Sequence, residues 1–380
     1  MEKKKSIFSY YKPYKKIFFA DMFFAIMASI ITLVIPLVVR YITSTVIYYE
    51  TDEAFRVILK LGLMMTVLIL FQCYCNYFIA NYGHVMGAKI EYDMRAEIFA
   101  HYQKLPFSFY DNQKVGQLLS RITSDLFDIT ELLHHGPENV VISAMKFIGA
   151  FVILFTISPK LTFAAFALIP FMFLYAWFFN RKMKKAFARN RVKIADINAQ
   201  IEDNLSGIRV VKSFANESVE EEKFKVGNDG FLAAKKDSYL YMGGYHSGLT
   251  AFINMITVIV LVAGGILITK AQVSVTDLVT FLLYISIMTD PVRTMIDFAE
   301  MFQNGYSGYE RFQEILAIEP DIQDSQGSEE LTDVKGTIDF ENVSFQYEEN
   351  TEKVLSHIDL HVDAGEYLAL VGSSGAGKTT

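Results

Sequence analysis

The chain has 380 residues, of which 52% are hydrophobic and only 20% are charged, whereas an average soluble protein carries about 25% charged residues. The mean hydropathy of +0.26 points the same way. A net charge of -7 at pH 7 offers no basic surface, which argues against a nucleic-acid partner. Length and hydropathy together indicate a membrane protein rather than two or three soluble domains.

Residues 1–16 mix lysines with aromatic side chains, a pattern typical of a short elbow lying at the cytosolic membrane surface. The uncharged stretch 22–39 that follows is longer than the ~7–15 residues of a signal-peptide core. We therefore expect a retained first membrane helix rather than a cleaved signal.

Six stretches are apolar enough to cross a bilayer, for which about 20 residues are needed. The expected spans are approximately 19–39, 61–82, 139–157, 161–179, 248–269 and 276–296. Lys146 interrupts the third span, but it lies near one end and its stem can extend to the interface. These spans define an expected transmembrane domain over residues 17–316.

Basic residues are concentrated in the two long connections between spans. Residues 83–138 hold five Lys and Arg and residues 180–247 hold 13, whereas the short connections 158–160 and 270–275 hold one each. The positive-inside rule then places the long connections and both chain ends in the cytosol. We expect a multi-pass protein of a bacterial plasma membrane, with helices that continue well past the bilayer.

Three groups of polar side chains within this domain have competing interpretations. Cys73 and Cys75 are expected to be buried packing residues, because no metal-ligating residue is near them in sequence. The pair at 134–135 is expected to be a solvated helix end rather than a metal site. Along the sixth span stand charged residues that either mark a pathway or pair with one another beyond the bilayer: Asp290, Arg293, Asp297 and Glu300. We expect pairing for the last two and leave the first two open.

After residue 316 the chain becomes acidic and polar, which indicates a linker over 317–336. Alternating apolar residues then predict two strands, the first starting near Ile338 with one slip and the second including Ile358. The apolar run 367–371 is typical of a buried central strand. Residues 337–380 are therefore expected to begin an α/β domain.

A phosphate-binding motif, G-x-x-x-x-G-K-T, follows this run directly. The expected nucleotide-binding residues are Gly372, Ser373, Ser374, Gly375, Ala376, Gly377, Lys378, Thr379 and Thr380. Glycines let backbone N–H groups turn toward phosphates. Lys378 is expected to reach the β- and γ-phosphates of ATP, and the Thr379 hydroxyl to ligate Mg²⁺.

Taken in order, these segments resemble the ABC exporter family, in which a transmembrane domain is fused to an ATPase. Residues 105–125 and 205–214 look like its two coupling regions, and residues 302–316 look like its exit from the sixth span. Tyr347 matches the aromatic residue that stacks on adenine. The coupling residues carried over by this resemblance are Asn112, Gly116, Leu118, Leu205, Gly207, Val210 and Phe214.

The resemblance implies an all-α six-helix transmembrane domain followed by the start of a phosphate-loop ATPase. It implies ATP-driven export or flipping of a hydrophobic small molecule, lipid or peptide by a dimer with an identical or sister half-transporter. The family's signature motif, catalytic glutamate and switch histidine are absent, so we expect a fragment that does not hydrolyse ATP itself. An ATP-gated channel or regulator is the alternative, and a membrane-anchored phosphate-loop enzyme is a weaker one.

Overall fold

The computed structural model describes residues 5–111, 113–320, 323, 327–329, 332–346 and 353–379. The chain divides into two compact units, residues 1–321 and 322–380.

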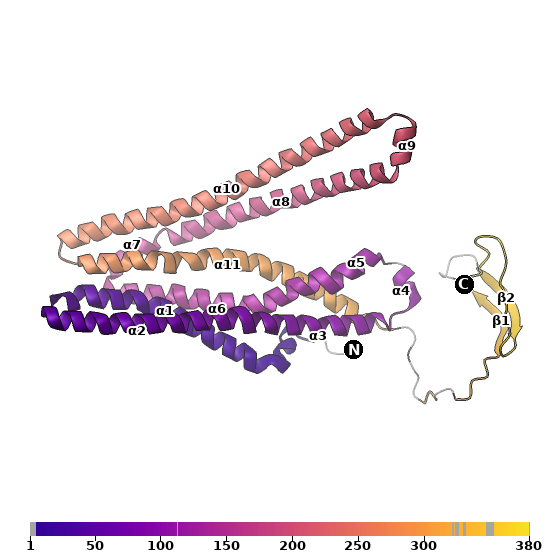
Figure 1. Ribbon diagram of the computed structural model, residues 1–380, viewed down its shortest axis with the longest axis horizontal. Coiled ribbons are helices and arrows are strands. Elements are labelled where there is room, and N and C mark those ends of the chain that lie inside the picture. Colours follow the sequence, from indigo (N-terminus) through magenta and orange to yellow (C-terminus); the bar gives the residue numbers. More distant parts are fainter. Residues whose placement is uncertain are drawn as a thin grey trace. The chain divides into compact units, whose positions relative to one another are not determined.

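The described part of the first unit is helical throughout (Figure 1). In chain order its elements are η1 (Ile7–Tyr14), α1 (Lys15–Ser44), η2 (Val46–Tyr48), α2 (Thr51–Phe78), η3 (Ile79–Gly83), α3 (His84–Tyr102), α4 (Phe107–Asp111), α5 (Val115–Ser120), η4 (Arg121–Asp125), α6 (Leu126–Ile157), α7 (Pro159–Phe166), α8 (Ile169–Ser206), α9 (Ile208–Ser213), α10 (Glu217–Thr269) and α11 (Val275–Leu316). The turns η1 and η2 are 3₁₀-helical, whereas η3 and η4 are π-helical turns within longer helices.

Six helical stretches of the described chain are long and apolar enough to cross a membrane, and each contains one expected span. Their bounds are Ile7–Tyr48, Thr51–Tyr102, Val115–Ile157, Pro159–Ser206, Glu217–Thr269 and Val275–Leu316. The longest has 53 residues and therefore extends about 80 Å at 1.5 Å per residue. Because a hydrocarbon core is only about 30 Å thick, the prediction that helices continue past their spans is confirmed.

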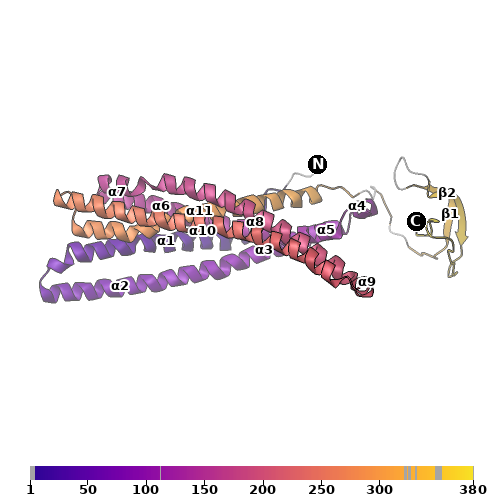
Figure 2. The ribbon, with the colours of Figure 1, turned by 90° about the horizontal axis from the view of Figure 1, so that it is seen from above.

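The long helices pack as neighbouring pairs. Helix α8 lies along α10 and α11 lies along α6, while α1 contacts α2, α6 and α11. Figures 1 and 2 show the α8–α10 pair diverging from the remaining helices toward α9. The far end of this pair is thus an arm held by few neighbours of its own unit.

Hydrogen-bonding side chains cap the starts of the helices that follow two short connections. The Ser158 hydroxyl accepts a hydrogen bond from the N–H of Leu161 at 3.4 Å, and α7 begins there. At the start of α11, Ser274 and Asp277 form a reciprocal capping box. Asp277 also accepts a hydrogen bond from Arg40 Nη2 at 2.7 Å, which ties α1 to α11.

Two apolar clusters hold the bundle together. The first joins α1, α6, α7, α8, α10 and α11 around the fully buried Tyr284 and Phe281. The second joins η1, α3, the start of α6 and the end of α11 around Met94 and Phe312. The elbow contributes Tyr10 and Tyr11 to this second cluster. The N-terminal segment therefore packs against helices of its own unit, in addition to its expected place at the membrane surface.

Much of the remaining apolar surface is exposed. Along α2, for example, Leu63, Val67 and Leu70 are between 56% and 68% exposed. Soluble proteins rarely expose continuous apolar stripes of this size. The exposed stripe is the expected property of a helix that faces lipid.

Two predictions for the polar residues of this unit were wrong. Cys75 is buried as expected, but Cys73 is exposed, because residues two apart on a helix lie on different faces. His134 is not at a solvated helix end, since α6 continues through Pro137 and the imidazole is only 3% exposed. Helix α3 covers it, and neighbouring sequence does not reveal that contact.

The structure agrees only in part with the pairing expected for the charged residues of α11. Glu300 forms an ion pair with Lys184 of α8 at 3.4 Å rather than with a residue of its own helix. Asp290 and Arg293 are both exposed. Lateral packing of α8 against α11 therefore decides the partner of Glu300.

The described part of the second unit contains two strands, β1 (Ile338–Phe345) and β2 (Leu355–Val362), which pair antiparallel. The predicted slip is real, since the register shifts between Phe340 and Val343. The expected central strand over 367–371 was wrong: these residues form no strand, and Tyr367 and Val371 are 102% and 89% exposed. A central parallel strand needs paired neighbours and two covered faces, which the described residues do not provide.

Candidate phosphate loop and coupling elements

The G-x-x-x-x-G-K-T segment folds into a glycine-dependent turn. Gly375 and Gly377 have φ of +83° and +78°, a backbone conformation that side-chain-bearing residues rarely adopt. A Cβ at Gly377 would also lie 3.1 Å from Leu355 Cδ2. The turn brings the N–H of Ala376 to the carbonyl of Ser373 at 3.3 Å. These two glycines are therefore required by the shape of the loop.

The Lys378 ammonium lies back across this loop. It donates to the carbonyls of Gly372 at 2.9 Å and Ser373 at 2.5 Å. Lys378 and Thr379 are both exposed, so the ammonium and the hydroxyl are accessible to a ligand. An exposed ammonium on a glycine-rich turn favours an anionic ligand such as a phosphate.

Three expected site residues lie outside the described residues: Asn112, Tyr347 and Thr380. Their proposed roles in coupling, adenine stacking and phosphate binding rest on sequence alone.

The first expected coupling region forms the short helices α4 and α5. Leu118 is partly buried against the second apolar cluster, and its carbonyl accepts from Tyr102 Oη at 3.5 Å. Gly116 is exposed, and a Cβ added to it would meet no atom of another element within 4 Å; Val115 and Leu119 are 79% and 60% exposed. One face of α5 is thus anchored while the other presents apolar side chains.

The second expected coupling region forms the reversal between α8 and α10. Gly207 ends α8, and its N–H donates to the Asp203 carbonyl at 2.9 Å. Along and beside α9, Leu205, Val210 and Phe214 are 62%, 62% and 76% exposed. Exposed apolar side chains gathered at the tip of an arm are typical of a docking surface.

A buried ion-pair group connects the first region to the end of α11. Asp125, with a side chain only 7% exposed, accepts from Arg311 Nε and Nη2 at 2.8 and 2.6 Å. Arg121 Nη1 donates to it at 2.9 Å. Burial by itself would raise the pKa of Asp125, but the hydrogen bonds from Arg311 and Arg121 hold it below its usual value.

Sequence reasoning placed these three residues inside the family-like segments but did not pair them. Asp125 and Arg311 are 186 residues apart, and only their packed helices bring them together. The sequence shows that charged residues lie near the ends of these helices, but it does not indicate which of them form ion pairs.

Comparison with known proteins gives a family match for most of the helical unit. A sequence model described as the ABC transporter transmembrane region matches residues 18–292. The chain is 38% identical to the uncharacterized ABC transporter ATP-binding protein YwjA of Bacillus subtilis (strain 168), over 99% of this chain and 65% of that protein. It is 27% identical to the putative multidrug export ATP-binding/permease protein YgaD of the same organism, with the same coverage.

A similar relative occurs in Staphylococcus aureus (strain NCTC 8325 / PS 47). It is a putative multidrug export ATP-binding/permease protein, 27% identical over 99% of this chain and 66% of its own length. The chain therefore spans slightly less than two thirds of the length of the relatives it matches.

Proposed function

Since this chain belongs to the family of ABC transporter transmembrane regions, we propose that it takes part in ATP-driven export, or flipping, of a hydrophobic or amphipathic compound. The observation that carries the proposal is the order of parts in one chain. Six long apolar helices, with two exposed elements between them, precede a glycine-dependent phosphate loop. Two relatives named as putative multidrug export proteins support the cargo class.

In this proposal the phosphate loop binds ATP. The backbone of Gly372–Gly377 surrounds the phosphates. Lys378 exchanges its hydrogen bonds to the carbonyls of Gly372 and Ser373 for contacts with the β- and γ-phosphates. Thr379 holds Mg²⁺, which would neutralise phosphate charge when bound. Tyr347 stacks on the adenine. The residues that catalyse hydrolysis are not assigned.

The elements α5 and α9 would transmit the nucleotide state to the bundle. Their exposed residues Val115, Val210 and Phe214 would contact ATP-binding domains. The Asp125–Arg311 pair would then carry movement of α5 to α11, because a buried bidentate pair resists separation. Binding of ATP would favour one of two packed arrangements, which is the physical basis of alternating access.

The proposed assembly is a dimer of identical or sister half-transporters in a plasma membrane, with both chain ends cytosolic. Six spans and one phosphate loop supply half of such a machine. The exposed α8–α10 arm supports this assembly, since the described residues of its own unit leave the apolar side chains of Val210 and Phe214 at its tip 62% and 76% exposed.

The test uses the full-length protein in sealed vesicles loaded with ATP on the side of the long connections. We expect a lipophilic fluorescent dye to move against its gradient only with ATP. Lys378→Ala should weaken ATP binding about 10- to 100-fold, the value of one or two charged hydrogen bonds, whereas Lys335→Ala in the linker should not. Dye movement that follows its gradient and merely switches on with ATP would establish a channel instead.

A further inference from the structure

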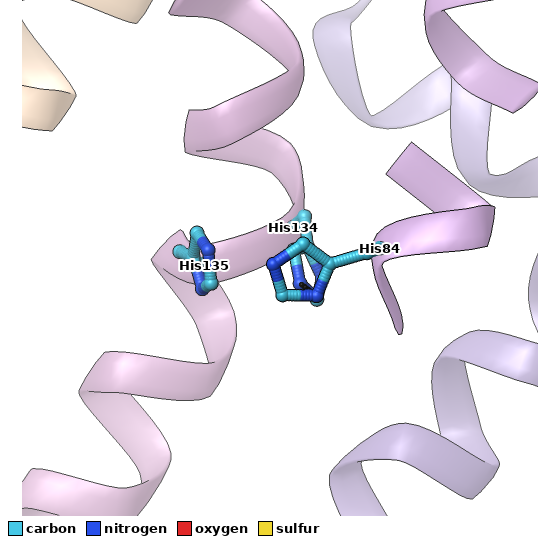
Figure 3. Close-up of side chains that lie close together, drawn as sticks. All are labelled: His84, His134 and His135. Atoms are coloured by element: carbon cyan, nitrogen blue, oxygen red, sulfur yellow. Dashed lines mark hydrogen bonds between the residues drawn. The ribbon is translucent and has the colours of Figure 1, made fainter. Parts of the chain in front are cut away.

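Three imidazoles from two separate helices meet where the start of α3 packs against α6. His84 is the first residue of α3, and His134 and His135 are on α6 (Figure 3). His84 Nδ1 and His134 Nε2 are 3.1 Å apart. The ring centroids of the three histidines are 4.3 to 5.0 Å apart. Each can offer a nitrogen to a common point, since these ligand atoms lie within 4.8 Å of one another.

Two carboxylates extend this group. Asp21 of α1 and Glu138 of α6 form a second set with His134, again with ligand atoms within 4.8 Å. Asp21 is 0% exposed, and among the described residues neither of its oxygens has a hydrogen-bond partner. The Nδ1 atom of His134 is likewise buried without a partner. A buried, unpartnered carboxylate is costly, and a bound cation would remove that cost.

The backbone beside the cluster is unusual as well. The π-helical turn η3 ends at Gly83, immediately before His84. A Cβ at Gly83 would lie 2.4 Å from His134 Cε1 and 2.9 Å from Asp21 Oδ1. Single π-turns are frequent at functional sites. Here the turn and the glycine allow α3 to approach His134 closely enough for His84 to face it.

We propose that His84, His134 and His135 bind a divalent transition-metal ion of the zinc class, with Asp21 and Glu138 offsetting its charge. Two nitrogens bound to one tetrahedral Zn²⁺ at 2.0–2.1 Å are about 3.3 Å apart, close to the 3.1 Å between His84 and His134. His135 Nδ1 lies 3.3 Å from Glu138 Oε2, the kind of carboxylate contact that orients metal-ligating histidines.

Occupancy of this site would connect three helices. Its residues come from α1, α3 and α6, so a bound ion would oppose any separation of these helices. His84 is exposed and provides a path of entry from solvent. The inference does not depend on the proposed transport activity, because metal binding is measured directly.

The test titrates Co²⁺ into the full-length protein, purified in detergent without a histidine tag. We expect one Co²⁺ per chain with the strong visible absorption of tetrahedral coordination, displaced by Zn²⁺. His84→Gln alters an exposed residue and should weaken binding at least about tenfold, as should His134→Gln. His246→Gln changes an exposed histidine of α10 outside the cluster and should leave binding unchanged.

A second measurement separates binding at this site from binding elsewhere. Zn²⁺ should raise the thermal unfolding midpoint of the wild type and of His246→Gln, but not that of His84→Gln. The proposal is overturned if the folded wild type binds no stoichiometric Co²⁺. It is equally overturned if His84→Gln binds Co²⁺ and gains stability from Zn²⁺ as the wild type does.

Discussion

Asp125 illustrates how a single carboxylate can organise the end of a helical bundle. It receives two hydrogen bonds from Arg311 of α11 and one from Arg121, four residues before it. Charge-assisted, bidentate bonds of this kind are stronger than neutral ones and fix orientation as well as distance. The interaction therefore positions the first expected coupling region on α11.

Replacing Asp125 by Asn should lower the thermal unfolding midpoint, because two arginines then lose their charged acceptor. The expected loss is about 2 kcal/mol, the typical value of hydrogen bonds to a charged group. The matched control is Asp196→Asn, which breaks an exposed pair with Lys193 and should cost less than about 1 kcal/mol. Equal effects of the two substitutions would show that Asp125 has no special structural role.

The same pair makes a prediction about pH. Hydrogen bonds from Arg311 and Arg121 outweigh burial and lower the pKa of Asp125 from 3.8 in the folded protein. A carboxyl with a lowered folded-state pKa stabilises fully above its unfolded pKa, and this contribution is lost as pH falls through the folded value. The stability difference between wild type and Asp125→Asn should thus be constant from pH 8 to 5 and shrink below about pH 4. A difference that shrinks between pH 7 and 6 would contradict this assignment.

At the scale of whole elements, the contact between α6 and α11 depends on glycine. A Cβ at Gly305 would lie 2.7 Å from the carbonyl oxygen of Asp128 and 2.6 Å from Leu132 Cβ. At Gly308 a Cβ would lie 3.0 Å from the Asp125 carbonyl. Because backbone atoms cannot move aside as a flexible side chain can, these glycines allow the two helices to approach closely.

Gly305→Ala should therefore force α11 away from α6 and destabilise the bundle by about 1–3 kcal/mol, the usual cost of overpacking. Gly243→Ala in α10 is the matched control, since nothing lies within 4 Å of its Cβ position. Alanine is the better helix former, so this control should be neutral or stabilising by up to about 1 kcal/mol. Thermal unfolding in detergent measures both. Gly305→Ala behaving like the control would show that the contact tolerates a methyl group.

At the scale of the whole molecule, the proposed function depends on which side of the membrane each connection occupies. Helical ends such as the first half of Glu217–Thr269, whose lysines all precede residue 237, are basic and lie opposite the short connection that follows Thr269. The proposed mechanism requires these ends to share a compartment with the phosphate loop. The proposed mechanism therefore depends above all on the orientation of the helices across the membrane.

Single cysteines test this orientation in a background with Cys73 and Cys75 replaced by alanine. Cysteine introduced at Val210 should resist an impermeant maleimide added to intact cells and react in inside-out vesicles, because the positive-inside rule keeps that loop in the cytosol. Cysteine introduced at Lys270, in a short connection, should show the reverse. Labelling of position 210 in intact cells would overturn the topology and the transport mechanism with it.

The sequence by itself determined the properties that depend on local composition. Apolar runs long enough for a bilayer identified six helices, and the shift in alternation after Phe340 predicted the slip between β1 and β2. The glycines of the phosphate-binding motif likewise predicted a turn there, and Gly375 and Gly377 have positive φ. Each of these follows from residues close in sequence, which hydrophobicity and backbone sterics describe well.

Only the tertiary structure decided the interactions between distant residues. It placed His84 against a buried His134, paired Asp125 with Arg311, and gave Glu300 a partner on α8. It also left the apolar run 367–371 exposed. The physical reason is common to all four: burial and pairing depend on which helix or strand packs alongside, and hydrophobic periodicity specifies a buried face without specifying its neighbour.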